Sequence, residues 1–148
     1  MIAALQRLAA SRLFHRQAEL RTRWQVVWWW ETRRPLYNLI VGTAGVLSCL
    51  LLLGLAAFSE HRFGEAIGLS DPPLFALFLA AFYGIAANIC FTGGWIAELL
   101  ARSVWREDAG SFGEIALLLG TLFSVALTLL PVVLVSLAVL VKLLTSQT

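Results

Sequence analysis

Apolar positions in this chain form three long blocks and are not scattered along it. The blocks cover residues 36–58, 74–97 and 115–141, and none of them contains Asp, Glu, Lys, Arg or His. Because a helix rises ~1.5 Å per residue, each block can cross a hydrocarbon core of ~30 Å. Backbone groups in lipid must bond within the protein, and the alternating ~10-residue segments of a barrel are absent. The pattern therefore predicts three transmembrane helices.

A different pattern precedes the blocks. Residues 2–31 contain neither proline nor glycine, and their apolar positions recur at helical spacing with most arginines off that stripe. This predicts a basic amphipathic helix in the membrane interface, or alternatively a helix packed on protein. Pro35 should start or kink the first span, and Pro131 should kink the third. The expected fold is all-α, with a basic interfacial region (residues 1–35) and a three-span domain (residues 36–148).

Charge adds an orientation. The net charge is only +2, but residues 1–35 carry seven arginines against two glutamates, whereas both connecting segments are net acidic. The positive-inside rule then predicts a cytoplasmic N-terminus and an external C-terminus. No cleavable signal peptide is recognisable. We expect a bacterial inner membrane; the arginine-rich, acid-poor start also fits a mitochondrial protein, which makes the mitochondrial inner membrane the alternative.

Tryptophans flank the predicted spans together with arginines. Indole rings favour the lipid–water boundary, where arginine can reach phosphates, so we expect interface anchors there. The predicted anchors are Trp28, Trp29, Trp30, Arg33, Arg34, Trp95 and Trp105. Nucleic acid can also bind arginines beside aromatic rings, but the adjoining span argues against that partner.

Small and polar residues recur at helical spacing inside the spans. In lipid, helices associate through close backbone approach and interhelical hydrogen bonds, so these stripes predict the helix contacts. The candidates for helix packing or ligand contact are Asn38, Gly42, Gly45, Gly84, Asn88, Thr92, Gly120 and Ser124. The Asn88 amide fits a bond to a neighbouring helix, a ligand or ion contact, or a lipid headgroup contact.

Reactive groups are few. We predict no catalytic residue, no metal ligand set and no cofactor, because the chain lacks the usual motifs and His15 and His61 fall on opposite sides of the membrane. Spans without ionisable side chains argue against a proton-coupled carrier. At the inner boundary we expect ion pairs among Glu98, Arg102 and Glu114, close to Arg33 and Arg34.

These features favour a non-enzymatic scaffold or accessory subunit of the membrane. Its expected partners are anionic lipids, which would bind the basic N-terminal region, and either further copies of the chain or a larger membrane protein. Two other classes stay open. One is an oligomeric channel or transporter lined by the Asn88, Thr92 and Ser124 faces. The other is a lipid-modifying enzyme using Glu98, Glu114 or His15 as its base.

Overall fold

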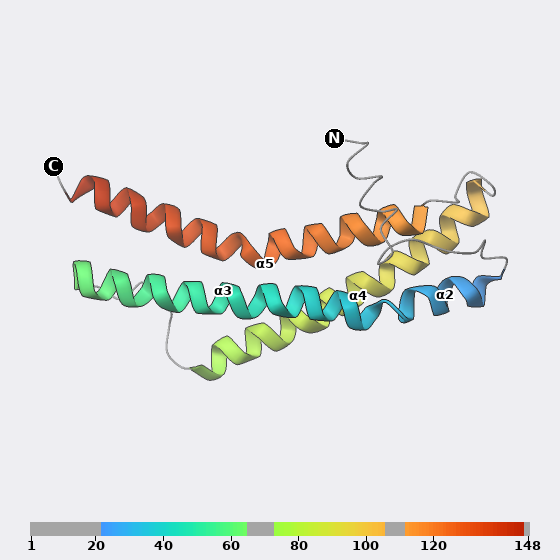
Figure 1. Ribbon diagram of the computed structural model, residues 1–148, viewed down its shortest axis with the longest axis horizontal. Helices are drawn as coiled ribbons and strands as arrows, with labels where there is room; N and C mark the ends of the chain where they lie inside the picture. The colour runs from blue at the N-terminus through green and yellow to red at the C-terminus, as the bar shows by residue number, and fades with distance from the viewer. Residues whose placement is uncertain (1–21, 65–72, 106–111, 147–148) are drawn as a thin grey trace.

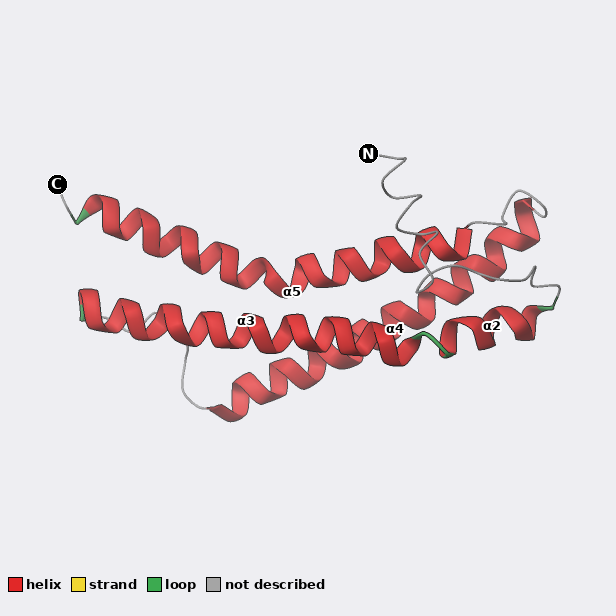
Figure 2. Ribbon diagram, in the orientation of Figure 1, coloured by secondary structure: helices red, strands yellow, loops and turns green. Residues whose placement is uncertain are grey.

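The computed structural model describes residues 22–64, 73–105 and 112–146, and this part of the chain is helical apart from short turns and helix ends. The helices are α2 (Arg23–Glu31), α3 (Arg34–Phe63), α4 (Pro73–Trp105) and α5 (Phe112–Thr145) (Figure 2). Three stretches are long and apolar enough to cross a membrane: Arg23–Phe63, Ala80–Trp105 and Phe112–Thr145. The prediction of an all-α protein with three spans is confirmed, and the helices extend beyond the apolar blocks at both ends.

The predicted continuous helix over residues 2–31 is wrong at Thr22. This residue has extended backbone angles, with φ −116° and ψ 150°, and α2 begins after it. The Thr22 hydroxyl accepts from the Gln25 amide at 3.3 Å, while the Gln25 side chain accepts from the Thr22 amide at 3.1 Å. This capping box satisfies two amides that would otherwise lack partners at the start of α2. Residues 1–21 lie outside the described residues.

α2 extends nearly in line with α3 and packs against α4 (Figure 1). A short turn at Thr32 and Arg33 separates the two helices, and Pro35 stands in the first turn of α3, as predicted. Proline is tolerated there because the first amides of a helix have no intrahelical acceptor. The inner face of α2 is buried, with Val26 only 1 % exposed. The described part of the predicted interfacial helix is therefore attached to the bundle.

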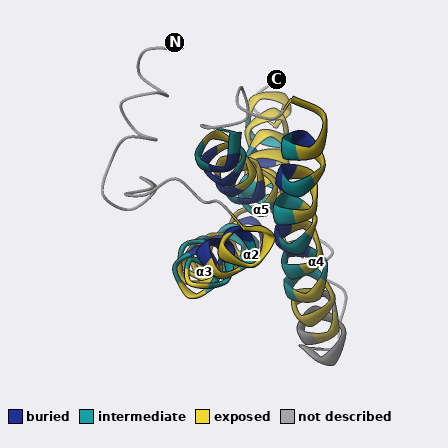
Figure 3. Ribbon diagram, turned by 90° about the vertical axis from the view of Figure 1, so that its right-hand side faces the viewer, coloured by how far each residue is buried: buried dark blue, intermediate teal, exposed yellow. Residues whose placement is uncertain are grey.

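The helices meet unevenly along their lengths. α3 packs most extensively against α5, while α4 crosses them and diverges from α3 toward its own N-terminus (Figure 1). Buried positions gather where α2, α4 and the start of α5 face one another (Figure 3). We call this region the α2 end of the bundle. α5 bends near its middle, and the proline inside this helix is Pro131, in agreement with the predicted kink.

Away from the α2 end, large apolar side chains point outward. Val46 on α3 is 63 % exposed and Phe123 on α5 is 70 % exposed, although both lie in membrane-spanning stretches. In water such a surface would drive aggregation, whereas in lipid it is the normal exterior of a helical bundle. The outer surface therefore supports a membrane-embedded protein.

Candidate functional site

A buried carboxylate lies at the α2 end, on α4. Glu98 is 0 % exposed, and its Oε2 accepts a hydrogen bond from the Trp30 indole Nε1 at 2.7 Å. Its Oε1 accepts from Arg102 Nε at 2.8 Å, which is the predicted i,i+4 ion pair. Burying a charge is tolerated only when it is paired and hydrogen-bonded, and both conditions hold here. This Trp30–Glu98–Arg102 cluster joins α2 to α4.

The indole reaches Glu98 because α4 has no side chain at Gly94. A Cβ atom built at Gly94 would lie 2.6 Å from Trp30 Cη2 and 2.7 Å from Cζ3. Trp30 also meets Trp29 and Phe91 edge to face, with ring centroids 5.8 Å and 5.3 Å apart. Trp30 is thus enclosed by rings, a glycine backbone and a carboxylate.

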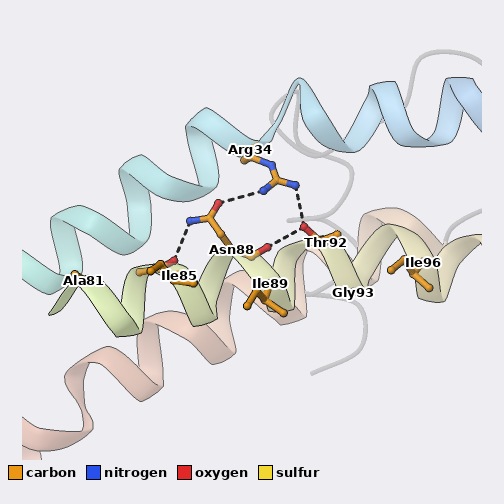
Figure 4. A pocket seen from close by; sticks show the side chains of 9 residues that line it. Arg34, Ala81, Ile85, Asn88, Ile89, Thr92, Gly93 and Ile96 are labelled. Atoms are coloured by element: carbon orange, nitrogen blue, oxygen red, sulfur yellow. Dashed lines mark hydrogen bonds between the residues drawn. The ribbon is translucent and has the colours of Figure 1, made fainter. Parts of the chain in front are cut away.

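A second polar layer surrounds Arg34, at the start of α3 (Figure 4). Glu31 accepts from Arg34 Nε and Nη2, both at 2.7 Å, in a forked ion pair. Across the helix interface, Arg34 Nη1 donates to Asn88 Oδ1 at 3.3 Å and Nη2 donates to Thr92 Oγ1 at 3.0 Å. The guanidinium also lies 5.0 Å from the Phe91 ring centroid. Three contacts with α4 and the forked pair with Glu31 therefore fix this cation.

A third layer joins α3, α4 and α5. The Tyr37 hydroxyl lies 2.9 Å from Ser124 Oγ and donates to the Ala87 carbonyl at 3.2 Å. The Tyr83 hydroxyl donates to the Ser124 carbonyl at 2.9 Å and lies 2.6 Å from Thr128 Oγ1. Hydrogen bonds between helices stabilise bundles in lipid, where unpaired polar groups are costly.

Removing the Ser124 hydroxyl should weaken this third layer modestly. We expect Ser124→Ala to lower the free energy of unfolding by about 1 kcal/mol, because Tyr37 loses one interhelical partner. Equilibrium unfolding in mixed micelles measures the change. Ser103→Ala is the matched control, since Ser103 is exposed and, among the described residues, its hydroxyl bonds the Leu100 carbonyl on its own helix. Equal losses in the two variants would contradict the assigned role of Ser124.

The tryptophans predicted as interface anchors separate into two groups. Trp28 and Trp105 are exposed, at 69 % and 60 %. Trp29 and Trp30 are buried and Trp95 packs against the core, so these three rings contact protein. The physical reason is that α2 packs on α4, so two of three adjacent indoles turn inward.

The Glu98–Arg102 pair forms as predicted, but the other charges expected beside it have different neighbours. Arg34 pairs with Glu31, its neighbour in sequence, and Arg33 stacks on the Trp29 ring with its guanidinium carbon 4.1 Å from the centroid. Glu114 stands in the first turn of α5, where a negative charge is favourable at a helix N-terminus.

Only part of the predicted small-residue stripes lies at helix contacts. Gly45 approaches Thr128, Asn88 and Thr92 contact Arg34, and Ser124 contacts Tyr37. Asn38 and Gly42 are exposed on α3, and a Cβ atom at Gly42, Gly84 or Gly120 would meet nothing within 4 Å. On α3, Asn38 and Gly42 therefore lie away from the buried face, which carries Tyr37, Val41 and Ser48, while Gly45 lies closer to it.

Several residues of these layers were not singled out from the sequence. Glu31, Tyr37, Phe91 and Gly94 were missed as partners, and one signal was available. Gly94 precedes Glu98 by four residues, which places a gap beside a carboxylate on one face of α4. Which aromatic ring fills that gap depends on how α2 packs against α4, and a local sequence pattern does not predict this packing.

Metal ligands and thiols are two kinds of reactive group that can be located among the described residues. Within residues 22–64, 73–105 and 112–146, no group of three His, Cys, Asp or Glu side chains could hold a metal ion. Cys49 and Cys90 are free thiols and exposed. Comparison with protein-family models, curated proteins and solved structures gives no match for this chain. The features of the molecule that bear on its function are therefore the three polar layers and the exposed helix faces.

Proposed function

We propose that this chain is a non-enzymatic scaffold or accessory subunit that binds transmembrane helices of its own kind or of a larger partner. One observation supports this most directly. The polar side chains inside the bundle are used to join its own helices, while the small and polar face of α3 at Asn38 and Gly42 stays open. Open small residues at helical spacing allow another backbone to approach closely.

The proposed setting is a bacterial inner membrane with the N-terminus in the cytoplasm. The arginines of residues 1–35 would then face the anionic leaflet, where each nearby basic residue contributes about 1 kcal/mol of attraction. The first connecting segment carries one arginine and the second carries two, so they add little to the orientation that the N-terminal arginines favour.

The proposal is tested by a substitution that places a large side chain on the open face of α3. Gly42→Leu should reduce association by about tenfold or more, because a leucine there keeps the partner backbone at a distance. The fold should survive, since a Cβ at Gly42 meets nothing within 4 Å. Native mass spectrometry from mild detergent reports stoichiometry and co-purifying subunits for each variant.

Gly54→Leu is the matched control. Gly54 lies on the same helix with equally open space, but twelve residues onward, which is about 120° around the helix from Gly42. Unchanged association of Gly42→Leu would contradict the proposal. Solute flux in liposomes that Asn88→Leu abolishes would favour the channel or transporter instead, and turnover of a lipid by the purified chain would favour the enzyme.

A further inference from the structure

A groove of about 700 Å³ runs along α4 beside the start of α3 (Figure 4). Its polar part is formed by Arg34, Asn88 and Thr92. The rest is apolar or small and is formed by Ala81, Gly84, Ile85, Ile89, Gly93 and Ile96. Ile85 and Ile89 are 62 % and 66 % exposed although they lie in a membrane-spanning stretch, so the groove opens toward lipid. It thus combines one fixed cation with an apolar floor.

The polar part retains donors for a ligand. Arg34 directs four of its five N–H groups to Glu31, Asn88 and Thr92. Within the described residues this leaves one N–H on Arg34 Nη1, and one on Asn88 Nδ2, whose other N–H bonds the Gly84 carbonyl. The two donors sit on side chains that contact each other. Such a pair, one charged and one neutral, suits a phosphate oxygen.

The ion pair beside these donors supplies the second part of a binding site. Arg34 and Glu31 remain partly accessible, with side-chain exposures of 27 % and 38 %. A headgroup with only a negative charge would be repelled by Glu31. A headgroup that carries a phosphate and an ammonium complements both charges, and an ammonium with N–H groups can donate to the carboxylate.

Beyond its polar part, the groove is long enough for an acyl chain. Within the lining, which extends from Ile96 to Ala81, the stretch from Thr92 to Ala81 advances about 16 Å along the axis of α4, which is about half of a ~30 Å hydrocarbon core. The polar lining residues Arg34, Asn88 and Thr92 stand at one end of this stretch, and the other lining residues from Ile89 to Ala81 are apolar or small. An acyl chain would follow this floor where α4 diverges from α3.

From these observations we propose that the groove binds one glycerophospholipid with a zwitterionic ethanolamine head. Its phosphate would contact Arg34 and Asn88, its ammonium would contact Glu31, and an acyl chain would cover Ile89 and Ile85. A partner helix would satisfy the apolar floor but would leave the remaining donors beside the ion pair unmatched. This site is separate from the open face of α3, so it stands or falls independently of the scaffold role.

The experiment compares lipids that differ only in the head. Phosphatidylethanolamine and phosphatidylglycerol with identical acyl chains are titrated into delipidated protein, and bound copies are counted by native mass spectrometry. We expect one phosphatidylethanolamine to bind about tenfold more tightly than phosphatidylglycerol, and Glu31→Gln to reverse the preference because it removes the repelling charge. If Glu31 had only a structural role, Glu31→Gln would not change which lipid headgroup is preferred.

The second part of the experiment fills the groove with a larger side chain. Gly84→Leu places a side chain over the floor without a clash at Cβ, and it should abolish the bound copy, while Gly54→Leu should retain it. Equal binding of the two lipids by the unaltered chain, or lipid binding that Gly84→Leu leaves intact, would overturn the proposal. Loss of a second protein copy in Gly84→Leu, with no effect on lipid, would assign the groove to a helix and overturn it as well.

Discussion

Replacing Gly94 by alanine is expected to displace Trp30 and to lower the free energy of unfolding by about 2 kcal/mol. The added methyl group would lie 2.6 Å from Trp30 Cη2, and the ring has little room to move. Trp30 is 2 % exposed, is bonded to Glu98 and meets Phe91 edge to face. Moving the indole would therefore also remove a partner from a buried carboxylate. Equilibrium unfolding in micelles and a shift of tryptophan emission measure the effect.

The chain offers a matched control at the next position. Gly93 is exposed and an added Cβ there would meet nothing within 4 Å, so Gly93→Ala should leave stability unchanged or slightly raise it. In a Trp30→Phe background the shorter side chain removes the clash, so Gly94→Ala should then have a much smaller effect. A loss of the same size in both backgrounds would show that Gly94 acts on something other than Trp30.

Much of the fold follows from local sequence patterns for which physical constraints allow few structures. Long uncharged blocks must be helices in lipid, Pro35 is expected to start or kink the first span, and the i,i+4 spacing of Glu98 and Arg102 predicts their ion pair. The structure has all three features. The start of α2 was also readable, because Thr22 and Gln25 match a capping box that the longer apolar stripe obscured.

The candidate site was less accessible from the sequence because it depends on how helices are rotated against one another. An indole is stable both at the lipid–water boundary and in a packed core, so Trp30 alone does not indicate which place it takes. Similarly, Asn38 and Tyr37 are adjacent but face different directions, and only the packing of α3 on α5 makes Tyr37 the partner of Ser124. The small residues indicated that the helices approach one another, but they did not indicate which face of each helix makes the contact.

Removing Arg102 should have the largest effect of any single charge change. Arg102→Leu is expected to lower the free energy of unfolding by about 3 kcal/mol or more, because it takes an ion-pair partner from a carboxylate that is 0 % exposed. Arg23→Leu is the control, since Arg23 is exposed at the start of α2. Its effect should stay within about 0.5 kcal/mol.

The double variant separates a charge effect from a packing effect. Glu98→Gln replaces the buried anion with a neutral side chain of the same shape, and its amide oxygen can still accept from the Trp30 indole. If the uncompensated charge is what destabilises Arg102→Leu, adding Glu98→Gln should restore most of the lost stability. If the lost packing of the arginine stem on α4 caused the destabilisation, the decreases in the free energy of unfolding of the two single variants would add. Restoration would show that the Trp30–Glu98–Arg102 cluster links α2 to α4 electrostatically, and it would explain why the helix that begins after Thr22 stays attached to the spans.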